Sequence, residues 1–344
     1  MPTIRHMGKD FTTKHYAHLT TEECRQIREA FWKKPDLAEV RAQIKKMYAG
    51  GSRMNHIYGY YFYHLMADCR LKGHKWTIKE FMESDYLIRF AIGKANAFPK
   101  IYAFDHAKNL KTLFRLSPSG TAAKLSNFPY KPVQEILQNY NVNNNYYDFS
   151  CGWGVRLMAA LCQDVNYFGT DPNAALCDNL NELVSEFKTQ TATTSQVDIR
   201  CQGSEIFVPE WENTMGVAFS SPPYFDLEVY SESDSTGQST NLGSYQAWLK
   251  HYLEPTIDNI SRYLIDEGYF LFNIKNIKDH NLYDDSKALI ESRGFVLEKE
   301  LDLKNTNRII LQQNDKDNNE RIMVFRKVHS LMIKTSGSLT DSYK

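Results

Sequence analysis

The chain has 344 residues, of which 42% are apolar and 24% charged, so it is long enough to bury the core of one large or two modest globular domains. Its longest apolar runs fall far short of the roughly 20 residues of a membrane span, and its first residues lack the apolar run of a signal peptide. A membrane or secreted protein is therefore disfavoured, and an intracellular location is expected. The six cysteines form no CxxC pair and show no spacing with histidine typical of zinc, so we expect reduced thiols and no metal site.

The zero net charge hides an asymmetry along the chain. Residues 1–115 hold 21 Lys and Arg against 11 Asp and Glu, which leaves 20 against 30 for the remainder. A basic segment joined to an acidic one suggests an anionic polymer as partner, because clustered positive charge releases counterions when it meets phosphates. A basic domain that simply docks on an acidic domain is an equally good explanation of the charge alone.

The basic segment, residues 1–115, is predicted to be a small helical domain. Thr20 and Thr77 are suited to cap helices that run to about residue 33 and residue 97, and a further helix is expected over 37–48. Its many tyrosines lie among basic residues and could contact nucleic acid, although aromatic residues at helical spacing more often form a core. The pattern turns loop-like over 111–127, and we place the domain boundary near residue 115.

A series of alternating apolar strands and amphipathic helices follows. The expected strands are 146–149, 166–170, 197–201, 216–220, 269–274, 295–301 and 321–326, and the expected helices are 133–140, 156–161, 174–187, 245–264 and 282–293. Such a series predicts an α/β fold, a three-layer Rossmann-like sandwich with a mostly parallel seven-stranded sheet over residues 116–330. The polar tail, 331–344, is expected to be disordered. The polar insertion 228–243 is placed to act as a lid or to be a plain surface loop.

Three loops at the expected carboxyl ends of strands carry the residue types of a nucleotide site. Gly152 and Gly154 follow Asp148 and the first strand, and glycines there let a ligand approach the backbone closely. Asp171 ends the second strand 17 residues after Gly154, close to the roughly 20-residue offset of a carboxylate that binds a ribose diol. The segment 203–205 ends the third strand, where it can reach an adenine ring. Together these loops predict an adenosine-bearing cofactor.

The fourth strand ends in Ser221, Pro222, Pro223 and Tyr224, which we call the SPPY turn. Its prolines fix the backbone and lack N–H donors, so the carbonyls of Ser221 and Pro222 are free to accept hydrogen bonds from an amino group. The ring of Tyr224 can stack on a base that carries this amino group. Catalysis is expected to rest on positioning by all four residues, with no strong general base. The segment could also be a plain surface turn, but its place at a strand end favours a binding role.

These features resemble the class I S-adenosylmethionine-dependent methyltransferases, and in particular the DNA amino-methyltransferases that modify adenine N6 or cytosine N4. The resemblance covers about residues 127–327. It implies that the glycine loop binds the methionine part of the cofactor, that Asp171 holds its ribose, and that the SPPY turn binds a base flipped out of the duplex. The cofactor residues so predicted are Phe128, Asp148, Ser150, Gly152, Gly154, Asp171, Ser204 and Glu205.

Several points are left open by the sequence. The order of the two motifs and the serine of the SPPY turn point to different target bases, so adenine and cytosine both remain. The basic segment 1–115 is the candidate for target recognition, with DNA as the expected partner. An RNA or protein-amide methyltransferase of the same fold is the alternative enzyme, and a catalytically silent DNA-binding subunit is the alternative of another class.

Overall fold

A computed structural model of the chain describes residues 3–6, 9–12, 17–96, 105–116, 122, 127–225, 228–229, 242–277, 280–302 and 321–328. The chain divides into two compact units. The helical unit comprises Met1–Val40, Asn55–Ser126 and Glu228–Ser235, and the sheet unit comprises Arg41–Met54, Asn127–Leu227 and Thr236–Lys344. The tail 331–344 and most of the insertion 228–243 lie outside the described residues.

The helical unit is built from short helices around an aromatic core. Its elements are α1 (Thr21–Trp32), the start of α2 (Leu37–Tyr48), α3 (Asn55–Ile57), the π-helix η2 (Tyr58–Phe62), α4 (Tyr63–Met66), α5 (Ile78–Glu83), α6 (Asp85–Asn96), α7 (His106–Leu116) and the strands β1 (Thr3–His6), β2 (Lys9–Thr12), β3 (Arg70–Leu71) and β8 (Glu228–Val229). Phe31, Phe81 and Phe114 meet edge to face at the centre of the core. Tyrosines at helical spacing contribute to this packing, with Tyr63 tilted against Phe31.

Local sequence signals set the starts of these helices. The Thr20 hydroxyl accepts from the Glu23 amide, and the Glu23 carboxylate accepts from the Thr20 amide, which closes a capping box on α1. The same reciprocal pair forms between Thr77 and Glu80 at α5.

Two expectations for this unit are corrected, and two pairs of strands are added. The helix expected over 77–97 breaks at Ser84, whose hydroxyl caps α6 by accepting from the Leu87 amide. The loop expected from residue 111 is the second half of α7. Two pairs of strands were not foreseen: the hairpin β1–β2, and β3–β8, which joins the chain just after the SPPY turn to the helical unit.

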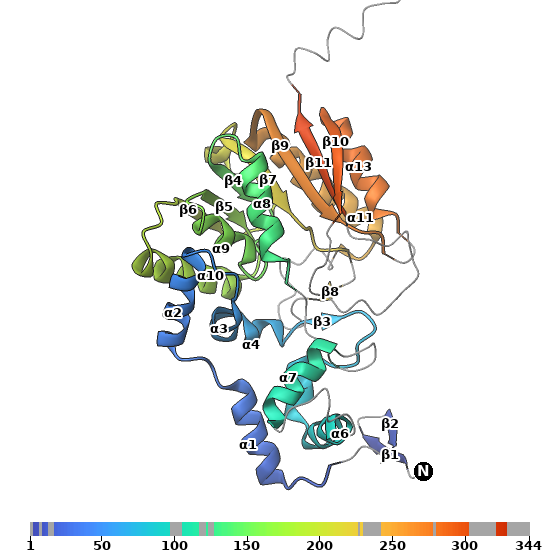
Figure 1. The fold of residues 1–344 in the computed structure, drawn as a ribbon. Coiled ribbons are helices and arrows are strands. Elements are labelled where there is room, and N and C mark those ends of the chain that lie inside the picture. Colours follow the sequence, from blue (N-terminus) through green and yellow to red (C-terminus); the bar gives the residue numbers. More distant parts are fainter. Residues whose placement is uncertain are drawn as a thin grey trace, which may run out of the picture. The chain divides into compact units, whose positions relative to one another are not determined.

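The sheet unit contains a seven-stranded sheet. Its strands are β4 (Asn145–Asp148), β5 (Asn166–Thr170), β6 (Val197–Arg200), β7 (Met215–Ser220), β9 (Leu264–Ile274), β10 (Phe295–Asp302) and β11 (Arg321–Lys327), in the order β10-β11-β9-β7-β4-β5-β6 (Figure 1). Strand β11 is antiparallel to both of its neighbours, whereas the other four pairings are parallel. The expectation of a mostly parallel sheet is therefore corrected to a mixed sheet, and the Rossmann-like α/β fold is confirmed.

Helices connect the strands and cover the sheet. They are α8 (Tyr130–Tyr140), α9 (Val155–Leu161), α10 (Ala174–Gln190), the 3₁₀-helix η3 (Pro209–Trp211), α11 (Tyr245–Trp248), the π-helix η5 (Leu249–Leu253), α12 (Glu254–Tyr263) and α13 (Leu282–Ser292). The chain winds from β4 to β5 and β6 in one direction and from β7 to β9 in the other. Because parallel crossovers are right-handed, the two directions place their helices on opposite faces of the sheet. The winding reverses between the neighbouring strands β4 and β7, the position at which open α/β sheets bind ligands beyond the carboxyl ends of their strands.

Within the described ranges, none of the helices combines the length and the apolar character needed to cross a membrane.

Candidate functional site

The glycine loop after β4 has a backbone that only glycine adopts readily at two places. Gly152 and Gly154 have φ of 54° and 72°, in the left-handed region where a Cβ is strained. The loop is fastened to β5 because the Cys151 amide donates to the Thr170 carbonyl at 3.2 Å. It is fastened to β7 because the Ser220 hydroxyl donates to the Ser150 carbonyl at 3.2 Å. Hydrogen bonds to both neighbouring strands hold the loop in place at the switch point.

Asp148, at the end of β4, is fully buried and its carboxylate is occupied by three donors. The Arg156 Nε and the Tyr167 hydroxyl each lie 2.9 Å from Oδ2, and the Ser150 amide lies 3.3 Å from Oδ1. Burial opposes the charge of Arg156, yet the Asp148 carboxylate beside it holds the pKa of the guanidinium above its ordinary value. Asp148 therefore shapes the glycine loop from inside the protein. Because the Asp148 side chain is fully buried, we expect it to affect a cofactor only through the backbone of the glycine loop.

Asp171 stands at the end of β5 and faces the glycine loop. Its Oδ2 accepts from the Gly152 amide at 3.3 Å, and its Oδ1 accepts from the Asn173 amide at 3.1 Å. Burial raises the pKa of Asp171 to about 6, although these two backbone hydrogen bonds act in the opposite direction. A carboxylate has about four lone-pair sites, so Asp171 can accept further hydrogen bonds from a ribose diol.

The loop after β6 holds Ser204 and Glu205 in different ways. The Ser204 hydroxyl is buried and hydrogen-bonded to the Thr256 hydroxyl at 2.8 Å, and its carbonyl accepts from Asn259, so Ser204 joins this loop to α12. The Glu205 Oε2 is buried without a hydrogen-bond partner, and burial raises the pKa of this carboxyl. A methyl group added to Gly203 would overlap the Glu205 carboxylate. Beside it, the Ile206 side chain is 52% exposed. The loop thus offers an unused acceptor next to an apolar surface.

The SPPY turn follows β7 and has two unused carbonyl groups. The carbonyl of Pro223 accepts from the Phe225 amide at 2.9 Å, and Phe225 has a left-handed φ of 49°. No described residue donates to the carbonyl of Ser221 or Pro222. The Tyr224 side chain is 9% exposed and packs in the core of the sheet unit. Its ring therefore offers an acceptor only a limited surface in this structure.

Asn273, near the end of β9, fixes the SPPY turn from the neighbouring strand. It is fully buried, and its Nδ2 donates to the Ser221 Oγ at 2.6 Å and to the Tyr224 hydroxyl at 3.2 Å. The Tyr224 hydroxyl in turn donates to the Asn273 carbonyl at 3.4 Å. One amide side chain thus positions both ends of the turn.

Phe128, the remaining predicted cofactor residue, is also near this edge. Its ring meets that of Phe219, in β7, edge to face at 5.5 Å. Hydrogen bonds therefore join the glycine loop to Asp171 and to Ser220, the last residue of β7 before the SPPY turn, and Phe128 lies against Phe219 in the same strand. The four loops belong to neighbouring strands of one sheet.

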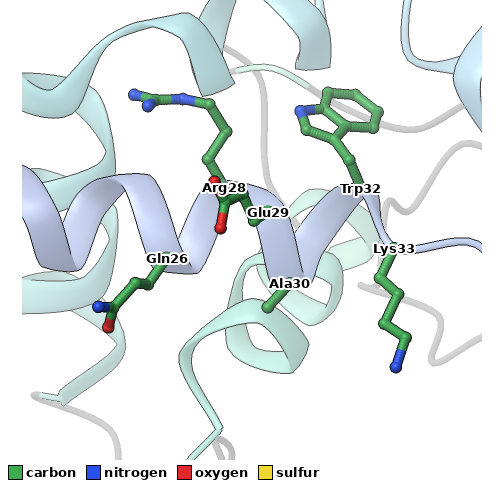
Figure 2. A pocket seen from close by; sticks show the side chains of 6 residues that line it. All are labelled: Gln26, Arg28, Glu29, Ala30, Trp32 and Lys33. Atoms are coloured by element: carbon green, nitrogen blue, oxygen red, sulfur yellow. The ribbon is translucent and has the colours of Figure 1, made fainter.

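A shallow hollow on the helical unit does not involve any predicted site residue. It is lined by Gln26, Arg28, Glu29, Ala30, Trp32 and Lys33, all from or just after α1 (Figure 2). The Arg28 guanidinium is engaged with Asp85 and the Met82 carbonyl, so it is part of the packing between helices.

Sequence reasoning missed Arg156 and Asn273. Arg156 is the one charged residue of α9, and Asn273 is the one polar side chain capable of hydrogen bonding through an amide in the apolar run 269–274 of β9; a polar residue so placed needs a buried partner. This signal is present in the sequence, but the identity of the partner depends on the fold.

No protein-family model and no curated protein matches the chain. Part of the chain resembles solved structures. A putative S-adenosylmethionine-dependent methyltransferase from Listeria monocytogenes is 12% identical, over 58% of this chain and 98% of that one, with a TM-score of 0.37. A TehB-like S-adenosylmethionine-dependent methyltransferase from Corynebacterium glutamicum is 13% identical, over 57% and 87%, with a TM-score of 0.38. The N-methyltransferase NodS from Bradyrhizobium japonicum is 8% identical, over 58% and 94%, with a TM-score of 0.39. None of these three names specifies DNA as a substrate, so the DNA amino-methyltransferase subtype stays a prediction.

Proposed function

We propose that the chain is an S-adenosylmethionine-dependent methyltransferase that modifies an exocyclic amino group of a base, with DNA as the substrate. One observation carries the proposal. At the switch point of the sheet, beside the glycine loop, the SPPY turn has two carbonyl groups that accept from no described residue, next to an aromatic ring. An amino group that needs two acceptors fits this arrangement, and a flat ring can stack on the limited part of the Tyr224 ring that is exposed.

The residues present fit the cofactor. The buried Glu205 Oε2 lacks a donor, and the amino group of an adenine ring would supply one while the ring lies on Ile206. Asp171 has lone pairs left for the ribose hydroxyls, and the backbone of Gly152 and Gly154 lets the methionine part approach the loop. When bound, S-adenosylmethionine supplies an activated methyl group on a positively charged sulfur.

The protein's own part in the reaction is positioning. Carbonyl oxygens of Ser221 and Pro222 accept the two N–H groups of the acceptor and thereby direct its nitrogen lone pair toward the methyl group. The ring of Tyr224 stacks on the ring that carries the nitrogen. Asn273 fixes the positions of Tyr224 and Ser221 through its hydrogen bonds to both. Correct placement of two reactants removes a large part of the barrier to a transfer of this kind.

The case for nucleic acid rests on the chemistry of the acceptor and on charge. The surplus of Lys and Arg over residues 1–115 favours a polyanion over a protein amide. A base inside a duplex cannot reach a site of this kind, so the target base would be flipped out of its stack.

The experiment is transfer of a labelled methyl group from S-adenosylmethionine to unmodified duplex DNA, followed by digestion and mass spectrometry of the nucleosides. N6-methyl-2′-deoxyadenosine or N4-methyl-2′-deoxycytidine is expected as the product, and either one also decides the target base. Label on structured RNA or on protein alone would transfer the proposal to those acceptors. A protein that binds neither S-adenosylmethionine nor its product in calorimetry would instead be a silent subunit.

The role of Tyr224 is tested with two variants. Tyr224→Ala removes the stacking ring and should lower the transfer rate by about 5-fold to 150-fold, since stacking of a base on an aromatic ring is worth about 1–3 kcal/mol. Tyr224→Phe keeps the ring, loses the hydroxyl with its hydrogen bonds to Asn273, and should retain most of the activity. Cofactor affinity should be unchanged in both. Wild-type turnover of Tyr224→Ala would show that the base does not bind there.

A further inference from the structure

Lys275 follows β9 at the edge of the sheet that carries the SPPY turn. Side chains two residues apart on an extended chain point to the same side, so Lys275 lies on the side of β9 from which Asn273 reaches the turn. Its Nζ lies over the Tyr224 ring, 5.9 Å from the centroid. The side chain is partly exposed. The end of β9 therefore contributes one residue that fixes the SPPY turn and a second that contacts its aromatic ring.

Lys275 has no ion-pair partner among the described residues, and its contact with Tyr224 is weak. A lysine over an aromatic ring at a partly exposed site contributes little compared with a charge pair, because water screens and solvates the ammonium group. Several other charged groups around the sheet are paired, including Arg156 with Asp148 and Arg293 with Glu254 and Asp258. An unpaired ammonium beside a proposed base-binding ring is thus available for an anionic group of the acceptor.

We propose that Lys275 is the residue that selects a phosphate-bearing acceptor: its ammonium group covers the Tyr224 ring in the free protein and binds a backbone phosphate next to the target base when the base takes its place on the ring. This inference rests on the proposed function and deepens it. Entry of a nucleotide exchanges a weak contact between cation and ring for base stacking plus a charge-assisted hydrogen bond to phosphate. A neutral amide acceptor offers no anion and leaves the displaced ammonium without a partner.

The test uses the full chain, the duplex whose labelled nucleoside has been mapped, and three variants. Lys275→Met keeps the length of the side chain and removes its charge, and Lys275→Arg keeps the charge. Lys188→Met is the matched control. Lys188 is exposed and lies in the last turn of α10. This helix ends near the amino ends of the parallel strands, away from the SPPY turn at their carboxyl ends. For each protein, KM for DNA and kcat are measured over a range of salt concentrations, and the Kd of S-adenosylmethionine is measured by calorimetry.

Loss of one phosphate contact should raise KM for DNA in Lys275→Met and reduce the slope of log KM against log salt by about 1. We expect kcat and the cofactor Kd to stay within about twofold of wild type. Lys275→Arg should restore KM, and Lys188→Met should behave as wild type.

A sharper test places a neutral methylphosphonate at the phosphates on either side of the target nucleotide. If Lys275 binds one of them, Lys275→Met will have no further effect on KM with that neutral duplex, because the two changes remove the same interaction. Additive effects at both positions, or an unchanged salt slope, would overturn the inference while leaving the methyltransferase proposal intact. An equal loss of cofactor affinity would show a structural role and would also overturn it. Absence of methyl transfer from wild type to any nucleic acid would overturn both proposals.

Discussion

Asp171 is a buried carboxyl at the proposed cofactor site, so its ionisation is expected to couple cofactor binding to pH. Burial raises its pKa to about 6 in the free protein. A ribose hydroxyl donates to the ionised carboxylate, so binding favours the ionised form, and affinity should rise as the pH increases through 6. At pH 5 only about one tenth of the carboxyl is ionised. We therefore expect the Kd of S-adenosylmethionine to fall about tenfold between pH 5 and pH 7, as measured by calorimetry.

The variant Asp171→Asn isolates this effect because it keeps the shape of the side chain and removes its titration. Its affinity should be weak and nearly independent of pH over the same interval. The stability of the free protein changes in the opposite sense: a raised carboxyl pKa means that the folded state binds more protons than the unfolded state between about pH 4 and pH 6, so unfolding becomes easier as the pH rises. A pH dependence of binding that survives in Asp171→Asn would assign the titration to another group.

At the scale of the element, strand ends were predictable and the contacts between them were not. The apolar runs located each strand of the sheet to within a few residues, except β9, which begins five residues before the expected Tyr269. Two loops could also be predicted from short stretches of sequence. They are marked by Gly152 and Gly154 and by the prolines of the SPPY turn, because these residues favour particular backbone conformations. By contrast, the hydrogen bond of Arg156 to Asp148, eight residues earlier, could not be predicted. Asn273 can donate to Ser221 only because the sheet places β9 beside β7.

The helix expected over 245–264 illustrates a second limit. It is present, but five residues in its middle, Leu249–Leu253, form a π-helix, and Pro255 is the second residue after this π-helix. A proline has no N–H and its ring clashes with the carbonyl four residues earlier, so a regular α-helix cannot continue unchanged through this point. The wider π-turn accommodates Pro255. Periodicity in the sequence indicates that a helix exists, whereas the type of each turn depends on such single clashes.

Strand β9 is expected to act on catalysis through Asn273. Asn273→Ala removes the donor to Ser221 and Tyr224, so the SPPY turn is no longer held in its position relative to the cofactor loop. A small displacement of a bound reactant can cost about 100-fold in rate, and we expect kcat to fall by about 10-fold to 100-fold with little change in the Kd of S-adenosylmethionine. Loss of a buried, hydrogen-bonded amide should also lower the free energy of unfolding by about 2 kcal/mol.

The matched control is Asn109→Ala. Asn109 is 3% exposed and lies in α7 of the helical unit, so its loss should cost a similar stability without changing kcat. Comparable losses of kcat in both variants would attribute the effect of Asn273→Ala to general destabilisation.

For the whole molecule, the sequence predicts that a basic helical segment recognises DNA and that an α/β domain carries the catalytic site. The structure shows where the chain leaves the sheet unit for the helical unit after the SPPY turn. Strand β8, which pairs with β3 in the helical unit, begins four residues after Tyr224. The turn that follows β3 carries Lys72 and Lys75, both exposed. Only three residues of the sequence, 225–227, therefore separate Tyr224 from the strand that pairs with β3.

This connection predicts that the lysines after β3 contribute to DNA binding. In the double variant Lys72→Glu and Lys75→Glu, two phosphate contacts should be lost, so DNA affinity should weaken and the slope of log Kd against log salt should fall by about 2. The Kd of S-adenosylmethionine should not change, because the cofactor residues lie in the sheet unit. The control pair Lys188→Glu and Lys250→Glu makes the same change of net charge on exposed residues of the sheet unit. If both pairs weaken DNA binding equally and with the same salt slope, the effect reflects net charge alone, and the helical unit is not the surface that recognises DNA.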